Sequence, residues 1–176
     1  MSDISSVLAK MKDEEVEYVD LRFTDPRGKM QHVTALSDIV DEDWFTEGWM
    51  FDGSSIAGWK SIDQSDMKLI PDAESAYIDP FYAEKTLALF CTVVEPDTGE
   101  LYDRDPRATA LKAEKYLKES GVGDASFWGP EAEFFLFDDV RFQVAINKVS
   151  YEVDAQDGSW NSDTDYEMGN MGHRPG

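Results

Sequence analysis

Residues 86–94, with the sequence Thr-Leu-Ala-Leu-Phe-Cys-Thr-Val-Val, are the stretch on which the predicted fold depends. The run consists almost entirely of apolar and β-branched side chains. Strands of this composition are buried on both faces, whereas half-exposed strands alternate between polar and apolar residues. The segment is therefore predicted to be the central strand of a sheet.

The preceding residues supply partners for this strand. Residues 18–24 alternate between apolar and polar side chains, which predicts a half-buried strand. The turn sequence Asp-Pro-Arg-Gly at 25–28 then leads to a partner strand over residues 30–36. Two short strands and two helices complete the predicted set, at residues 67–70, 76–78, 3–14 and 38–46. Together these elements predict a small mixed-sheet α+β domain.

A second domain is predicted to follow a boundary at residues 103/104. Asp105 and Pro106 are typical of a helix N-cap and first helical position, and Gly121 would end that helix. Its inner face is predicted to consist of Ala110, Leu111, Ala113 and Leu117. Residues 127–137 and 140–153 alternate like two strands of a new sheet. Two strands without covering helices do not complete a core, so we expect domains at 1–103 and 104–176, the second of them truncated.

The composition restricts the classes of partner. Thirty-seven acidic residues against 16 basic residues give a formal net charge of −21 at pH 7. Such a surface repels nucleic acid and anionic membranes, and it attracts cations such as metal ions or ammonium. Solubility alone explains most of these acids, so only a few of them are candidates for a site.

The sequence also indicates where the protein acts. No apolar run approaches the roughly 20 residues that span a bilayer, and residues 1–20 lack the pattern of a secretion signal. The single cysteine, Cys91, cannot form an internal disulfide, which is compatible with a reducing cytosol. A cytoplasmic location without membrane attachment is therefore expected.

The first candidate site is the sequence Phe-Asp-Gly-Ser-Ser-Ile-Ala-Gly-Trp at residues 51–59. Its two glycines and its small polar residues predict an ordered loop from which Asp52 projects. Ordered loops with a projecting acid are common functional positions. The alternative is a tight connection in which Asp52 and the serines only bind nearby amides.

The second candidate site contains Glu131 and Glu133, which precede an apolar run. On a strand, residues two apart point from the same face, where two carboxylates repel each other unless cations lie between them. Such oxygens suit Mg²⁺ or Mn²⁺, although Mg²⁺ requires six ligands. The alternative is a solvated edge strand. His32 is expected to be a surface or packing residue, and His173 alone carries little weight.

In this order and spacing, the two sites resemble the bacterial type I glutamine synthetase family. The resemblance rests on YVDLRFTD at 18–25, FDGSS at 51–55, QSDMKL at 64–69, GPEAEFF at 129–135 and GHRPG at 172–176. It covers essentially the whole chain. It implies an amino-terminal β-grasp domain followed by the incomplete start of the catalytic α/β domain.

The resemblance also implies an activity, namely ATP-dependent condensation of L-glutamate and ammonia through γ-glutamyl phosphate. By analogy, Asp52 would bind ammonium and take its proton, and Ser55 would help to hold the loop and the substrates. Glu131 and Glu133 would each bind a different ion of a Mg²⁺ or Mn²⁺ pair. Family members form dodecamers of two hexameric rings, in which the Asp52 loop completes a neighbouring subunit's site.

The sequence departs from the family pattern in two ways. Ala132 stands where many relatives carry proline, and the family's downstream metal ligands, ATP-binding segment and regulatory tyrosine region are absent. We therefore expect the 176-residue chain to be inactive by itself. Two alternatives remain open: a related ligase that joins glutamate to a larger amine, and a short paralogue that acts as an interaction or regulatory module of the full-length enzyme.

Overall fold

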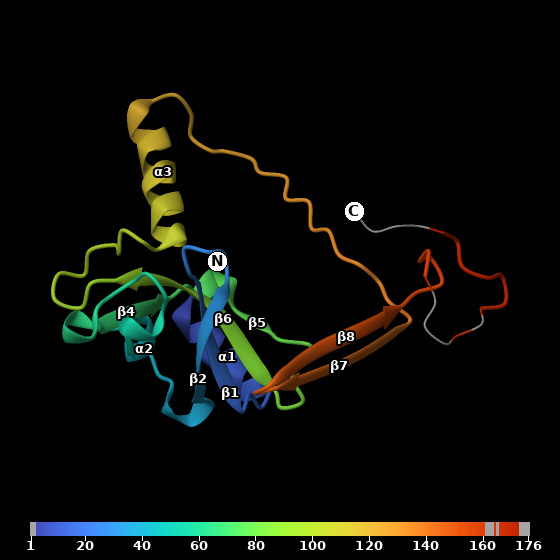
Figure 1. Cartoon of the computed structure of the whole chain (residues 1–176). Coiled ribbons are helices and arrows are strands. Elements are labelled where there is room, and N and C mark those ends of the chain that lie inside the picture. Colours follow the sequence, from blue (N-terminus) through green and yellow to red (C-terminus); the bar gives the residue numbers. More distant parts are fainter. Residues whose placement is uncertain (1–2, 161–163, 165, 173–176) are drawn as a thin grey trace. The chain divides into compact units, whose positions relative to one another are not determined.

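The structure, a computed structural model, describes residues 3–160, 164 and 166–172 (Figure 1). These residues form two compact units that divide between Ser126 and Phe127. In the described part of the chain, no helix has the length and apolar character needed to cross a membrane.

The first unit contains a mixed six-stranded sheet with β6 at its centre. Its strands are β1 (Tyr18–Thr24), β2 (Met30–Leu36), β3 (Trp49–Asp52), β4 (Asp66–Pro71), β5 (Tyr77–Ile78) and β6 (Thr86–Val94). The strand order is β2-β1-β6-β4-β3, and β5 also pairs with β6. Of the pairings, β1 with β6 is parallel and the others are antiparallel. The predicted central position of residues 86–94 is confirmed.

One face of this sheet is covered by helix α1 (Ile4–Asp13). Asp3 caps the helix by accepting a 2.8 Å hydrogen bond from the Ser6 N–H. Val7 and Met11 of α1 pack into one buried cluster with inward-facing side chains of the sheet, including Leu21. A mixed sheet that holds a helix in this way has the β-grasp arrangement, so the predicted α+β fold is confirmed.

The opposite face carries a buried charged network. Asp20 is only 1% exposed, because its carboxylate accepts hydrogen bonds from Arg22, His32 and Thr34, each at 2.7 Å. Arg22 also donates to Asp79 at 2.6 Å. Burial by itself would raise the pKa of Asp20, but the bonds from His32, Thr34 and Arg22 outweigh it and lower the pKa. The prediction that β1 is only half buried is therefore wrong at Asp20.

Two local predictions also need correction. Residues 38–46 do not form one helix, because a 3-10 turn, η1 (Ser37–Ile39), is followed by the short helix α2 (Asp43–Thr46). Strand β3 lies where only the start of a loop is predicted. The remaining 3-10 turns are η2 (Gly53–Ser55), η3 (Ile62–Gln64) and η4 (Ala73–Ser75).

Helix α3 (Pro106–Ser120) belongs to the first unit. The fully buried Asp105 carboxylate accepts two hydrogen bonds, both at 2.9 Å. One comes from the backbone N–H of Arg107 and caps the helix, and the other comes from the backbone N–H of Val93 in β6. The helix is thereby tied to the central strand. The predicted start and end of this helix are confirmed, but its predicted inner face is largely exposed within the described residues, where Leu111 is 37% exposed. The predicted division at residues 103/104 stays a prediction.

The second unit is built on a hairpin of β7 (Asp139–Ala145) and β8 (Lys148–Asp154). The predicted strand over residues 127–137 is wrong, because this segment has no ladder partner among the described residues. The predicted strand over 140–153 is instead a hairpin that turns between Ala145 and Lys148. One face of the hairpin is apolar and exposed, with Phe142 and Tyr151 at 75% and 76%.

Candidate active site

Asp52 is the last residue of β3, at the point where the chain leaves the edge of the sheet. Its Oδ1 accepts hydrogen bonds from both the backbone N–H and the hydroxyl of Ser54, at 2.8 and 2.6 Å. These bonds cap the turn η2, because an aspartate at this position can bind the backbone two residues ahead. The Asp52 side chain remains exposed to solvent.

The surroundings of Asp52 keep it ionised. The hydroxyl and then the backbone N–H of Ser54 lower the pKa of the Asp52 carboxyl, burial opposes them, and the hydroxyls of Ser55 and Ser65 lower it further by lesser amounts. Hydrogen bonds to a carboxylate stabilise its charged form. The structure therefore brings Asp52 and Ser55 together around one exposed negative charge, which suits a cation.

The chain directly after Asp52 is pinned to β4. Gly53 donates its N–H to the Ser65 carbonyl at 2.6 Å. A Cβ atom at position 53 would lie 2.4 Å from Cγ of Met67, whose side chain is fully buried. Glycine is thus required here by a close approach of the backbone to the core, and this contact fixes the position at which Asp52 leaves the sheet.

The other end of the loop is anchored by Trp59, which is 5% exposed. Its indole packs against the rings of Phe23, Phe51 and Tyr102, with centroid distances of 5.4, 6.1 and 5.2 Å. Aromatic pairs at these separations add stabilisation beyond the area that they bury. The loop over residues 51–59 is therefore ordered at both ends, as the sequence predicts.

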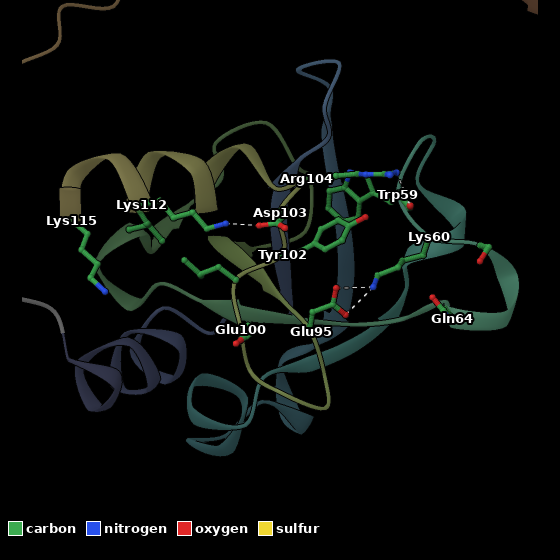
Figure 2. A pocket seen from close by; sticks show the side chains of 13 residues that line it. Trp59, Lys60, Gln64, Glu95, Glu100, Tyr102, Asp103, Arg104, Lys112 and Lys115 are labelled. Atoms are coloured by element: carbon green, nitrogen blue, oxygen red, sulfur yellow. Dashed lines mark hydrogen bonds and ion pairs between the residues drawn. The ribbon is translucent and has the colours of Figure 1, made fainter. Parts of the chain in front are cut away.

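Two cations lie beside this aromatic anchor (Figure 2). Arg104 donates through Nη1 to the carbonyl of Trp59 at 3.0 Å and also to the carbonyl of Gly58. Lys60 lies 2.7 and 2.8 Å from the two carboxylate oxygens of Glu95. The Lys60 ammonium also lies 5.2 Å from the centroid of the Tyr102 ring. These contacts connect the end of the loop to the segment that leads into α3.

An open hollow of about 880 Å³ lies beside these residues (Figure 2). Its lining contains both charges, from Lys60, Arg104, Lys112, Lys115, Glu95, Glu100 and Asp103. Most of the cations already have partners, since Lys112 lies 2.5 Å from Asp103 and Lys115 lies 3.7 Å from Glu119. The hollow therefore does not by itself define an anion-binding site.

Glu131 and Glu133 lie in the second unit, in an extended segment outside the hairpin, and both are exposed. Carboxylate oxygens are suitable ligands for Mg²⁺ or Mn²⁺. However, no group of three or more His, Cys, Asp or Glu side chains within the described residues is arranged to hold a metal ion. The donor type fits the metal but the number of ligands does not, so the described residues hold at most part of a metal site.

The two histidines and the cysteine add no site. His32 Nδ1 contacts Asp20, and its side chain is half exposed, which agrees with the surface or packing position expected for it. His173 lies outside the described residues. Burial raises the pKa of the Cys91 thiol, which keeps it protonated and unreactive at neutral pH.

Sequence reasoning did not identify Arg104 or the Lys60–Glu95 pair. Arg104 is 46 and 45 residues from the two carbonyls that it binds, and Lys60 is 35 residues from Glu95. Spacing along the chain cannot reveal contacts of this kind, because they depend on the strand order of the sheet.

Comparison with known proteins assigns both parts of the chain. Residues 15–96 match the family model of the glutamine synthetase β-grasp domain, and residues 103–173 match the model of the glutamine synthetase catalytic domain. Glutamine synthetases of Cereibacter sphaeroides and Rhodobacter capsulatus are 70% and 68% identical over 176 residues. The match covers all of this chain but only 38% and 40% of those proteins.

A solved structure of Plasmodium falciparum glutamine synthetase has the same fold, with a TM-score of 0.68 at 20% identity. The match covers 90% of this chain and 31% of that one. Fold and sequence together thus define an enzyme chain in which a β-grasp domain precedes the start of a catalytic domain. The chain belongs to the glutamine synthetase family. Members of this family generally use ATP and a divalent metal, and they form oligomers.

Proposed function

We propose that this chain supplies the ammonium-binding loop of a glutamate–ammonia ligase. The reaction is the ATP-dependent condensation of L-glutamate and ammonia to L-glutamine through γ-glutamyl phosphate, and it takes place in the cytoplasm. The single observation that carries the proposal is the exposed Asp52 carboxylate, which the Ser54 donors hold in its ionised form.

Asp52 first acts as a binding group. An ionised carboxylate attracts NH₄⁺, and Ser55, whose hydroxyl also contributes to the charge stabilisation, helps to orient it. The lowered pKa favours binding over proton transfer, since a general base works best with a pKa near the operating pH. Enclosure by the rest of the active site would raise this pKa through desolvation. Asp52 then takes a proton from NH₄⁺, and ammonia attacks the γ-carbonyl carbon. The bond between this carbon and the phosphate oxygen breaks, and phosphate leaves with the second proton that the nitrogen loses.

Glu131 and Glu133 are proposed as ligands of two Mg²⁺ or Mn²⁺ ions, with further ligands from outside the described residues. When bound, the ions would neutralise charge on the transferring phosphoryl group. The proposal also includes assembly into a dodecamer of two hexameric rings, in which Asp52 of one subunit serves the catalytic domain of its neighbour.

The test is a chimera that joins residues 1–176 of this chain to the remaining part of the Cereibacter sphaeroides enzyme. We expect the chimera to form glutamine and the 176-residue chain alone to form none. Asp52→Asn in the chimera should raise the KM for ammonium and lower kcat by roughly 10²-fold, the lower end of the effect of one acid–base group. Rings of normal size should still form. Full activity of the Asp52→Asn chimera would refute the assignment.

The metal ligands need a separate measurement. Glu131→Gln and Glu133→Gln chimeras should each require more Mg²⁺ for half-maximal activity, since each removes one charged oxygen ligand. Asp157→Asn, which removes an acid of the same unit that the proposal does not use, serves as the matched control. An unchanged Mg²⁺ titration for both glutamate variants would remove them from the metal site.

A further inference from the structure

The loop over residues 53–59 is held at its two ends by different means. At its start, Gly53 is bonded to the Ser65 carbonyl and packed against Met67. At its end, the fixed groups are the Trp59 ring and the carbonyls of Gly58 and Trp59. Ser54 and Ser55, whose hydroxyls stabilise the Asp52 charge, lie between the two anchors.

The aromatic anchor alone does not fix the direction of the chain. The Trp59 indole nitrogen is buried and has no hydrogen-bond partner among the described residues, so the ring is held by apolar and aromatic contacts. Apolar burial is non-directional, and ring pairs orient the indole but not the main-chain carbonyls, whereas hydrogen bonds to a carbonyl are directional. Gly58 has a φ of +83°, and no atom would contact a Cβ there, so neighbouring side chains do not restrain this position.

Arg104 supplies directional contacts that tie this end of the loop to the rest of the unit. The Trp59 N–H also donates to the Ile56 carbonyl at 3.1 Å, but that hydrogen bond lies within the loop. Its guanidinium donates to two consecutive carbonyls, and charge-assisted bonds of this kind are stronger than bonds between neutral groups. Arg104 also precedes Asp105, which ties the start of α3 to β6. The residue that carries the guanidinium is thus adjacent to a contact between α3 and the central strand, and in Figure 2 the Arg104 side chain lies beside Trp59.

We propose that Arg104 is a positioning residue for ammonium binding. It holds the exit of the loop, and thereby keeps the hydroxyls of Ser54 and Ser55 in register with the Asp52 carboxylate. This role rests on the proposed function of Asp52. Arg104 itself touches no substrate and accepts no proton.

The experiment uses the same chimera with Arg104→Met, Arg104→Lys and Lys112→Met. Lys112 is the matched control, because it lines the same hollow but pairs with Asp103. We expect Arg104→Met to raise the KM for ammonium by about five- to tenfold, the loss of roughly one charge-assisted hydrogen bond at a partly exposed site. The KM values for glutamate and ATP and the ring assembly should not change. Arg104→Lys, which keeps the charge but lacks the planar fork, should restore part of the affinity.

Hydrogen exchange provides a second readout. Amides of residues 54–59 should exchange faster in Arg104→Met than in Lys112→Met, while those of β6 stay protected. The role of Arg104 would be overturned if Arg104→Met had a normal ammonium KM and normal exchange while Asp52→Asn had a raised ammonium KM. That result would leave the proposed function intact. A normal ammonium KM in Asp52→Asn would instead refute the proposed function, together with the role that depends on it.

Discussion

The two units of this chain use the same alternating pattern with different results. In the first unit, inward-facing residues of the sheet such as Leu21 and Leu89 are 0% and 1% exposed, because α1 and the loops around Trp59 cover them. In the second unit, the equivalent apolar positions Phe142 and Tyr151 stay exposed. Alternation therefore specifies which face is apolar, but burial depends on whether a second layer is present.

The two candidate sites also differ in how many surrounding groups their own unit supplies. Asp52 is surrounded by donors from its own unit, so its charge and position are set locally. Glu131 and Glu133 lie on an exposed segment without a third ligand among the described residues. The hydrogen-bond donors around Asp52 are thus already in place in the first unit, whereas a metal site at Glu131 and Glu133 would need further groups.

The largest expected effect is on the core of the first unit. Leu89→Ala should lower the free energy of unfolding of the first unit by about 3 kcal/mol, since truncation of a fully buried leucine leaves a cavity. Urea titration followed by tryptophan fluorescence measures this, because Trp44 and Trp59 are buried in the same core. Ile62→Ala is the control, at a side chain that is 86% exposed, and should change stability by less than roughly 0.5 kcal/mol. Equal losses of unfolding free energy in Leu89→Ala and Ile62→Ala would mean that burial under the second layer does not determine the stability of the first unit.

A smaller effect is expected at the connection between α3 and the sheet. Asp105→Ala removes a helix cap and also leaves the buried N–H of Val93 without its acceptor, so we expect a loss of about 2 kcal/mol. Asp3→Ala removes an exposed cap of α1 and should cost about half as much. The same urea titration compares them. Similar losses would mean that the bond to Val93 contributes little.

The buried network at Asp20 should make the first unit sensitive to acid. The pKa of Asp20 is lower in the folded protein than in the unfolded chain, where it is about 3.9. The ionised carboxylate therefore stabilises the fold at pH values above about 3.9, and this stability is lost as the pH falls through the folded pKa. Asp20→Asn should therefore cost about 1–2 kcal/mol at pH 7 and progressively less below about pH 4. Urea titrations at pH 7 and pH 3 test this. A difference from the original protein that stays constant with pH would exclude the ionised Asp20 as its source.

Local patterns predict most of the fold, for identifiable reasons. The central strand over residues 86–94 and the cap Asp105 depend on composition or on neighbouring residues, so the sequence reveals them. Strand β3 has only four residues, too few for alternation to separate it from the loop that follows. Residues 127–137 alternate but have no neighbouring strand in the described part of the chain, and pairing cannot be deduced from one strand alone.

The candidate site shows the same division between local and distant contacts. The loop glycines and serines near Asp52 follow from the sequence, because they act within a few residues. The contacts of Arg104 do not, because it binds carbonyls 45 and 46 residues away in the sequence. The sequence does not predict the burial of Asp20 either, because its partners His32 and Thr34 lie on the adjacent strand. Their contact with Asp20 depends on the register between β1 and β2.

The smallest effect in this chain is expected on the open face of the hairpin. Phe142→Ala should change the stability of the second unit by less than roughly 0.5 kcal/mol, because the ring is already 75% exposed. In the chimera with the remaining catalytic segment, the same change should cost about 3 kcal/mol, since that segment would add the second layer that the first unit already has. Thermal unfolding of both proteins with and without the substitution measures the two losses. Gln143→Ala is the control, because position 143 lies on the opposite face of the hairpin and should change stability little in either protein. Equal losses for Phe142→Ala in the two proteins would mean that the apolar face of the hairpin stays exposed in the longer protein as well. The difference in burial between the two units would then be a property of the hairpin and not of a missing second layer.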